Sequence, residues 1–318
     1  PMGKGPHVHS ACPRSRVARI VSCRYGRTAV DRRIVTASPV SGPRWSPSQP
    51  ETRATVLEYA AATHVGQVRS VNEDTFLVGP PVFVVADGMG GYARGDVAST
   101  LVVEAFEALV GRSDLAVADL TGCIDTARAA ISALDEGDGP PGSTVVAAAY
   151  VVESGHGYWL IAHEGDSRAY VWRKGSLQQI TRDHSVVQEL IDAGELNAEQ
   201  ARSHHERHVI TRAVGALPDS LPEFSLVPVE PDTRLLLCSD GLTGELSETS
   251  IALLLEAASG AQEAVDSLVR AGVDAGGHDN VTALVVEVVR MADDATVDTL
   301  GSPDDFRSDT LPSARRRA

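Results

Sequence analysis

Five aspartates lie beside glycines or polar turn residues at the ends of apolar, β-branched runs. A single Asp-Gly pair is an ordinary turn signal. Five carboxylates that a fold brings together would repel one another, and they could not all ionise near neutral pH. Hard divalent cations, which prefer oxygen ligands, are the expected partners of such a group. The five residues are Asp74, Asp87, Asp166, Asp240 and Asp279.

The stretch "VVADGMGG", residues 84–91, places three glycines within four positions of Asp87. Glycine removes side-chain bulk and permits positive φ, so the backbone can turn sharply and approach a phosphate or a metal closely. Taken alone, the stretch is explained equally well by an ordinary turn. Arg69, five residues before Asp74, could present a fork of donors to a phosphate at the same place. An aspartate cluster with one arginine favours phosphoryl hydrolysis, although a plain surface arginine is the alternative.

The cysteines and histidines bear on which metal the chain would bind. Four cysteines at positions 12, 23, 123 and 238 show no paired spacing, so neither a zinc site nor a disulfide framework is indicated. Magnesium or manganese is favoured instead, and the lack of a disulfide framework indicates the cytoplasm. The segment "HHERH" groups His204, His205 and His208 but lacks the spacing of metalloprotease helices. We expect it to be a solvated, mobile loop.

Two kinds of apolar pattern indicate the secondary-structure elements that must position these residues. Short apolar runs predict strands, and apolar stripes at helical spacing predict helices, in an order that favours antiparallel sheets flanked by helices. Residues 185–222 break this order and are interpreted as a functional flap. Strands are expected at 57–65, 75–86, 144–152, 158–162, 168–172, 224–229, 234–238 and 281–289, and helices at 97–109, 124–134, 247–258 and 261–273.

The two ends of the chain differ from its centre in composition. The net charge is −15, yet residues 1–57 carry ten Lys and Arg against two acidic residues. We interpret 1–57 as a disordered basic leader or translated upstream sequence, and 291–318 as a disordered tail. The acidic centre disfavours nucleic-acid binding. No apolar stretch is long enough for a membrane helix.

Several segments together resemble the metal-dependent protein phosphatases, the type 2C serine/threonine phosphatases, in their bacterial stand-alone form. They occur in family order and cover residues 58–290, which would be the phosphatase domain. The matching segments are "GQVRSVNEDTF", "VVADGMGG", "GSTVVAA", "GDSRAYVWRKGSL", "TRDHSVVQELIDAGEL", "HVITRAVG", "LLLCSDGL" and "GGHDNVT".

The resemblance implies an α+β fold, a four-layer α-β-β-α sandwich of two antiparallel sheets flanked by helices. It implies a core of two Mn²⁺ or Mg²⁺ ions, with a weaker third. Asp87 would bridge the two ions, the Gly88 carbonyl would be a further ligand, and Asp240 and Asp279 would complete the shell. Four other residues have implied roles: Asp74 as a ligand or holder of a metal-bound water, Glu73 in support, Asp166 at the third position, and Arg69 as the clamp on the substrate phosphate.

The implied reaction is hydrolysis of phosphoserine and phosphothreonine in proteins by direct attack of a metal-bridging hydroxide. Met89 stands where many eukaryotic members carry the histidine proposed as general acid. Glu164 departs from the expected small or apolar residue and would either alter the third position or point to solvent. The implied partners are phosphorylated proteins, including Ser/Thr kinases and their substrates, and the chain is expected to be monomeric. Two alternatives stay open: a non-catalytic phosphoprotein-binding module, and a two-metal phosphoesterase acting on small substrates.

Overall fold

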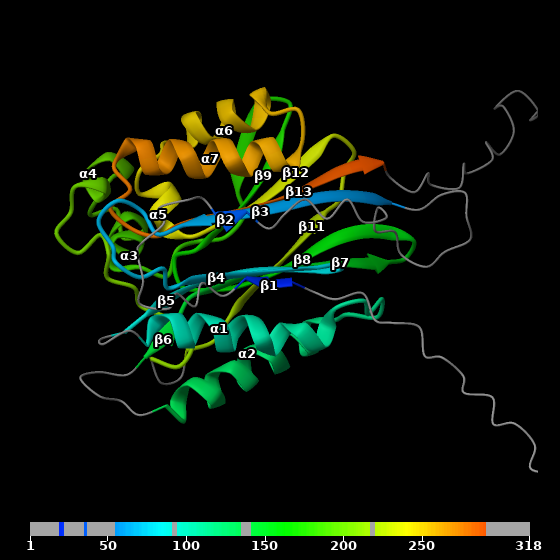
Figure 1. The fold of residues 1–318 in the computed structure, drawn as a ribbon, viewed down its shortest axis with the longest axis horizontal. Coiled ribbons are helices and arrows are strands. Elements are labelled where there is room, and N and C mark those ends of the chain that lie inside the picture. Colours follow the sequence, from blue (N-terminus) through cyan, green and yellow to red (C-terminus); the bar gives the residue numbers. More distant parts are fainter. Residues whose placement is uncertain are drawn as a thin grey trace, which may run out of the picture.

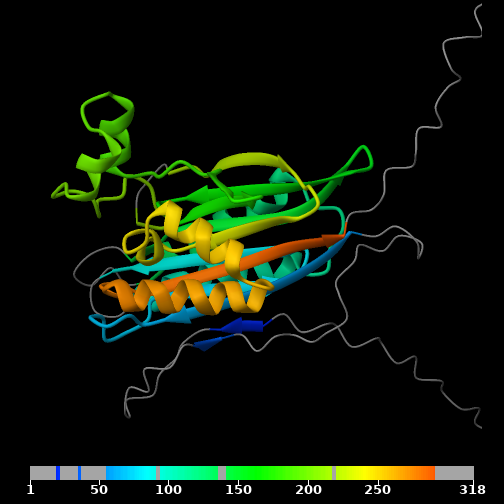
Figure 2. The same cartoon turned by 90° about the horizontal axis from the view of Figure 1, so that it is seen from above.

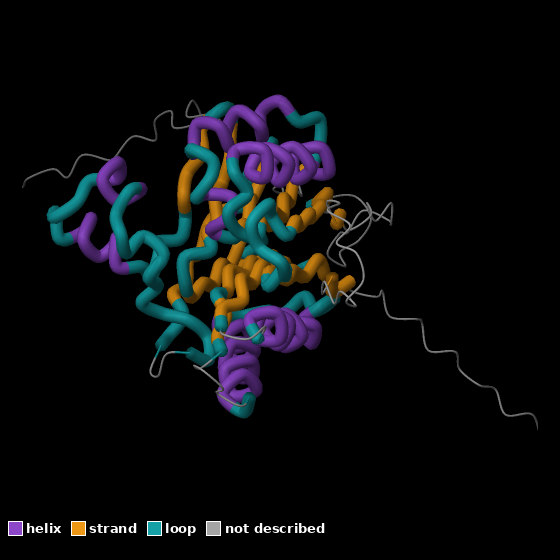
Figure 3. Tube along the Cα trace, turned by 60° about the vertical axis from the view of Figure 1, so that its left-hand side comes forward, coloured by secondary structure: helices purple, strands orange, loops and turns teal. Residues whose placement is uncertain are grey.

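Two antiparallel β-sheets lie face to face, with a pair of helices on the outer side of each (Figure 1). This computed structural model describes residues 55–90, 94–134, 141–216 and 220–290, together with the backbone of two short strands at 19–21 and 35–36. The layer order is helices, sheet, sheet, helices, as the tube in Figure 3 also shows. The predicted four-layer α+β sandwich is confirmed.

The first sheet has the strand order β1-β4-β5-β7-β8-β11, with β6 paired to β5, and the second has the order β10-β9-β12-β13-β3-β2. Every pairing is antiparallel. The strands are β1 Arg19–Val21, β2 Val35–Thr36, β3 Val56–His64, β4 Asp74–Gly79, β5 Val82–Met89, β6 Gly142–Ser143, β7 Val145–Glu153, β8 His156–Glu164, β9 Arg168–Arg173, β10 Ser176–Gln179, β11 Glu223–Pro228, β12 Thr233–Cys238 and β13 Val281–Arg290.

The helices of the described residues form two pairs and four shorter pieces. Helix α1 packs on β4 and β5 and against α2, while α7 packs on β3 and β13 and against α6. The flap carries α3 and α4, which stand away from the sheets in Figure 2. The helices are α1 Gly95–Phe106, the short 3-10 helix η1 Glu107–Leu109, α2 Val117–Ser132, α3 Val186–Asp192, α4 Ala198–Arg202, α5 Asp240–Thr243, α6 Glu248–Ala257 and α7 Ala261–Ala275.

Three apolar layers hold the sandwich together. One lies between the first sheet and α1 and α2, and includes Phe106 and Ile124. A second lies between the sheets, where Phe83 and Trp159 meet edge to face at 6.1 Å. The third joins the second sheet to α6 and α7. Strands that are buried on both faces explain the nearly continuous apolar runs in the sequence.

The expected helices and strands are present, with shifts at their ends. The run 75–86 divides into β4 and β5 around Pro80–Pro81, because proline cannot continue the ladder. Strands β1, β2, β6 and β10 and helix α5 were not predicted, and β1 and β2 lie in the segment expected to be disordered. Within the described residues, no helix combines the length and hydropathy needed to cross a bilayer.

The predicted boundaries at 57, 58 and 290 stay predictions. The tail, residues 291–318, lies outside the described residues, and so does the leader apart from its two short strands and residues 55–57, of which Val56 and Leu57 begin β3. Strand β1 pairs with β4, and β2 pairs with β3.

Candidate metal centre

Both sheets contribute aspartates to one end of the sandwich. Asp74 and Asp87 are directly opposite each other in the β4–β5 ladder of the first sheet. Asp240 follows β12 and Asp279 precedes β13, two paired strands of the second sheet. Asp166 lies in the connection by which the chain passes from β8 in the first sheet to β9 in the second. Because the sheets are stacked, these strand ends bring carboxylates that are distant in sequence into one place.

The carboxylates of this end of the sandwich influence one another's ionisation. Burial raises the pKa of Asp87 well above its ordinary value, and repulsion from Asp74, Asp240, Asp166 and Asp279 raises it further. Burial followed by the charge of Asp240 likewise raises the pKa of Asp166. For Asp240 itself, burial and then the charge of Asp279 raise the pKa. A group of carboxylates that mutually raise one another's pKa values is the arrangement that a divalent cation would neutralise.

Asp74 provides the most specific sign of a missing partner. Its Oδ2 accepts hydrogen bonds from Ser239 Oγ at 2.7 Å and Thr282 Oγ1 at 2.6 Å. Its Oδ1 is buried and has no hydrogen-bond partner. Burial raises the pKa of this carboxyl to about 7, against the opposing effect of the two hydroxyls. An unsatisfied carboxylate oxygen among other carboxylates fits a hard cation.

The glycines near Asp87 are required by close backbone packing. A Cβ on Gly88 would overlap the backbone oxygen of Gly95, at the start of α1, and would lie 2.8 Å from the carbonyl oxygen of Glu73. The Glu73 side chain accepts a hydrogen bond from the Gly95 backbone. Glu73 therefore fixes the start of α1 against the strand that carries Asp87.

Arg69 lies at the mouth of the centre. Its guanidinium NH2 donates to Asp279 Oδ2 at 2.7 Å, and 52% of its side chain is exposed. Asn280 holds the loop that carries it, because its Nδ2 donates to Val65 O at 3.0 Å and to Val71 O at 2.9 Å. Asn280 was not among the predicted site residues, although it stands directly after Asp279 in the "HDN" motif.

A comparison with known families shows which family the chain belongs to. The model of the Protein phosphatase 2C family matches residues 64–273, which include Arg69 and four of the five aspartates. The chain belongs to the protein phosphatase 2C family. The matched range ends a few residues before Asp279, the fifth aspartate.

Relatives within the family are named serine/threonine phosphatases. PstP of Mycobacterium tuberculosis is 38% identical over 241 residues, covering 74% of this chain but only 45% of PstP. The chain therefore spans less than half the length of this relative. The phosphatase stp of Listeria monocytogenes is 34% identical over 239 residues, which are 71% of this chain and 93% of stp.

Solved structures agree with this membership of the type 2C phosphatases. The crystal structure of PstP has a TM-score of 0.68 and 34% identity, covering 73% of this chain and 98% of that one. A structure of the PstP catalytic domain in complex with two manganese ions has a TM-score of 0.66, again at 34% identity, with 73% and 98% covered. The predicted family and fold are thus confirmed. The predicted cofactor class agrees with the ions in that relative.

Two further predictions concern Glu164 and the "HHERH" segment of the flap. Glu164 does not point to solvent, because it is fully buried and paired with Arg128 of α2 at 3.2 and 2.8 Å. That alternative is wrong, and an effect on the third metal position stays a prediction. In the "HHERH" segment, His204 and His205 lie ring to ring at 4.4 Å. His208 is exposed.

Proposed function

We propose that this chain is a divalent-metal-dependent phosphatase that hydrolyses phosphoserine and phosphothreonine in proteins. The observation that carries the proposal is the opposed pair Asp74 and Asp87, with an unsatisfied buried Oδ1 on Asp74 and with Asp166, Asp240 and Asp279 near enough to raise the pKa of Asp87. Membership of the type 2C family supports the same activity, since the named relatives are serine/threonine phosphatases.

In this proposal two Mn²⁺ or Mg²⁺ ions are held by Asp87, the Gly88 carbonyl, Asp240 and Asp279. Asp74 holds an ion or its water, and Asp166 serves a weaker third position. When bound, the ions supply positive charge to the phosphate and lower the pKa of a coordinated water. Hard oxygen donors suit both metals.

Arg69 would bind the phosphate of the substrate. One of its NH groups is used by Asp279, and the half-exposed guanidinium retains further donors. A guanidinium can bind two phosphate oxygens at once, which fixes the orientation of the phosphorus as well as its charge. Arg69 would therefore hold the phosphate at the edge of the carboxylate group.

The described cysteines do not supply a nucleophile. Burial raises the pKa of Cys123 to about 11 and that of Cys238 to about 12, so both thiols stay protonated at neutral pH. Only the thiolate is an effective nucleophile. This supports attack by water on phosphorus without a covalent intermediate on either thiol.

The test is hydrolysis of a phosphothreonine peptide as a function of Mn²⁺ concentration, comparing the native chain, Asp240→Asn and the chain with EDTA. Asp114→Asn is a matched control, because Asp114 pairs with Arg112 at the surface. Metal-dependent turnover that Asp240→Asn abolishes and Asp114→Asn preserves is expected. A folded chain that binds Mn²⁺ but releases no phosphate would favour a non-catalytic phosphoprotein-binding module. Turnover of p-nitrophenyl phosphate alone would favour a phosphoesterase for small substrates.

The biological setting is also a proposal. The substrates would be phosphorylated proteins of bacterial signalling, including Ser/Thr kinases and their targets, and the enzyme would act as a cytoplasmic monomer. Phosphoproteomics of a strain that lacks the gene, with fractionation and sedimentation of the native chain, would test these three points.

A further inference from the structure

The part of the flap that carries α3 and α4 is joined to the sandwich through a narrow neck. We define this neck as residues 184–186 and 209–211. Thr211 N donates to His184 O at 2.8 Å and Val186 N donates to Val209 O at 2.9 Å, so the outgoing and returning chains pair here. Ser185 and Ile210 form an antiparallel bridge between these two bonds. His184 is therefore the first residue of the neck and is also buried, at 3% exposure.

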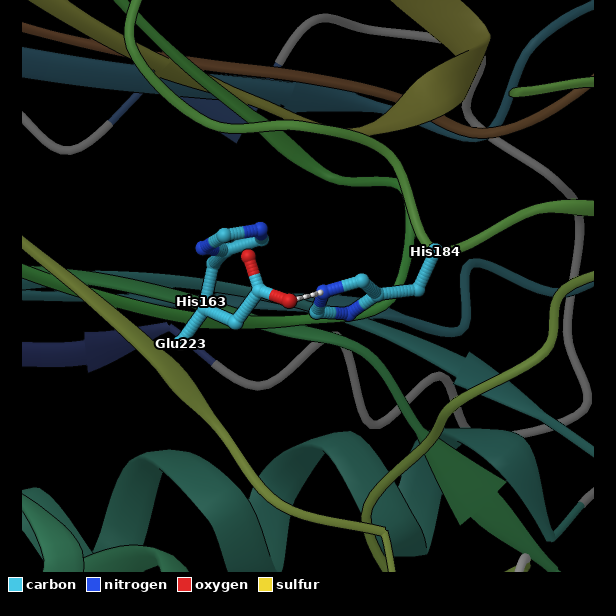
Figure 4. Close-up of side chains that lie close together, drawn as sticks. All are labelled: His163, His184 and Glu223. Carbon is cyan, nitrogen blue, oxygen red and sulfur yellow. Dashed lines mark ion pairs between the residues drawn. The ribbon is translucent and has the colours of Figure 1, made fainter. Parts of the chain in front are cut away.

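The side chain of His184 points toward His163 and Glu223 (Figure 4). Its ring stacks on that of His163, with centroids 4.6 Å apart and an interplanar angle of 14°. Its Nε2 lies 3.3 Å from Glu223 Oε1, the oxygen that also accepts from Arg212 NH1 at 2.8 Å. Arg212 follows the neck directly. The cluster thus joins the end of β8, the neck and the start of β11.

The hydrogen bond from Gly165 sets the tautomer of His184. Its Nδ1 accepts from the Gly165 backbone N–H at 3.1 Å, so in the neutral ring the proton is on Nε2. Nε2 lies 3.3 Å from Glu223 Oε1 and 3.2 Å from Arg212 NH1, and in this tautomer it can donate to Glu223 but cannot accept from Arg212, which donates to Glu223 instead. Burial, then the neighbouring His163 and Arg212, lower the pKa of His184 to about 4. The ring is accordingly neutral at physiological pH, and each of its nitrogens has a defined partner.

Two histidines and a glutamate could instead bind a transition metal. The contacts oppose this, because a metal on His184 Nε2 would move the proton to Nδ1 and break the bond from Gly165. The guanidinium of Arg212 also occupies the carboxylate that would be the third ligand. Only Nδ1 of His163 lacks a hydrogen-bond partner among these ring nitrogens. The geometry therefore favours a hydrogen-bonded joint over a metal site.

His184 is also hydrogen-bonded to Gly165, the residue before Asp166. His184 N also donates to Gly165 O at 3.0 Å, so Gly165 is bonded to His184 through both its N–H and its carbonyl. Gly165 has a φ of +113°, and a Cβ there would lie 2.7 Å from Thr144 Cβ. On the other side of Asp166, Ser167 Oγ lies 2.7 Å from Thr144 Oγ1. The backbone on both sides of Asp166 is thereby fixed.

We propose that His184 is a positioning residue that ties the neck of the flap to the Gly165–Asp166 peptide and so sets the geometry of the weaker metal position at Asp166. The inference rests on the proposed function for the role of Asp166 as a metal ligand. It assigns His184 to the support of that ligand and to no contact with substrate. The position of the flap and the affinity for the third ion would then both depend on the hydrogen bonds of His184.

Two substitutions separate the two ends of the ring. In His184→Asn the amide oxygen stands at the same bond count as Nδ1 and can accept from Gly165, but the contact with Glu223 is lost. In His184→Gln the amide NH₂ stands at the position of Nε2 and can donate to Glu223, but the acceptor for Gly165 is lost. Asp166→Asn serves as the reference for loss of the ligand itself.

The readout is Mn²⁺ binding by isothermal titration calorimetry, which does not depend on turnover, together with thermal unfolding in EDTA. We expect His184→Gln to weaken the weakest class of Mn²⁺ binding by about fivefold, the effect of one lost neutral hydrogen bond. His184→Asn should restore that affinity to within about twofold of the native chain, a margin well inside the fivefold loss.

Equal weakening in both histidine variants, or in neither, would overturn the proposal. So would an Asp166→Asn variant with native Mn²⁺ binding, because Asp166 would then not be a ligand. Stoichiometric binding of Zn²⁺ that His163→Ala abolishes would show the metal site instead. Native Mn²⁺ binding without phosphate release would count against the proposed function while leaving this test valid.

Discussion

Asp74→Asn should stabilise the metal-free chain at alkaline pH, although it removes an acidic residue from the proposed centre. The Asp74 carboxyl is fully buried, and its pKa is about 7 instead of its ordinary 3.8. Ionising it in the folded chain is therefore unfavourable, and the rise in pKa corresponds to about 4 kcal/mol. An asparagine in the same place carries no charge and can keep Oδ1 on the hydroxyls of Ser239 and Thr282.

The pH dependence has a definite sign. At pH 5 the unfolded carboxylate has already lost its proton, whereas the folded one keeps it until about pH 7. The folded state then binds more protons, so the free energy of unfolding falls as pH rises. Over the two pH units from 5 to 7, Asp74 should lower the free energy of unfolding by about 3 kcal/mol. This loss of stability is complete above pH 7, and it is absent below pH 4.

The assay is urea unfolding in EDTA at pH 5 and pH 8, followed by tryptophan fluorescence, to which the buried Trp159 contributes. The native chain should lose stability between the two pH values, and the loss should be smaller by about 3 kcal/mol in Asp74→Asn. Asp114→Asn, whose side chain is 78% exposed, should show the native pH dependence. An Asp74→Asn chain with the same loss as the native one would refute the assignment of an unfavourable buried charge to Asp74.

Three other perturbations have expected outcomes. Arg69→Lys keeps the positive charge but loses the paired N–H donors of the guanidinium, so kcat/KM for a phosphopeptide should fall by about tenfold. Mn²⁺ binding measured by calorimetry should stay near native. An unchanged kcat/KM would show that Arg69 does not bind the phosphate. Gly88→Ala places a Cβ against the backbone of Gly95, and it should lower the free energy of unfolding by about 3 kcal/mol, as measured in urea. Glu164→Gln leaves the guanidinium of Arg128 without its charged partner, and it should lower the free energy of unfolding by about 2 kcal/mol. The Mn²⁺ dependence of turnover should not change. A shifted Mn²⁺ dependence would place Glu164 at the third metal position.

The aspartates and the layered fold could be predicted because each signal is local. An apolar strand followed by Asp-Gly is visible within eight residues, and the segments that carry the family resemblance are equally short. The run 75–86 was less clear, since a buried hairpin and one long strand have the same composition. Only Pro80 and Pro81 indicated the break between β4 and β5.

The supporting contacts could not be predicted, since they depend on which strand ends meet. Ser239 and Thr282 hold Asp74 across sequence separations of 165 and 208 residues. Neither hydroxyl differs in sequence from an ordinary strand residue. Glu164 shows the same limit, because its partner Arg128 comes from α2, and the strand pattern alone left solvent as an open alternative.

The carboxylates that would bind metal also tie the stability of the fold to it. Burial raises the pKa values of Asp74, Asp87, Asp166 and Asp240 in the metal-free chain, so their ionisation near neutral pH opposes folding. A cation that binds only the folded state removes this repulsion and adds its own binding free energy. Mn²⁺ should therefore raise the unfolding temperature of the native chain more at pH 8 than at pH 5. A temperature shift equal at both pH values would mean that the ion binds away from these carboxylates.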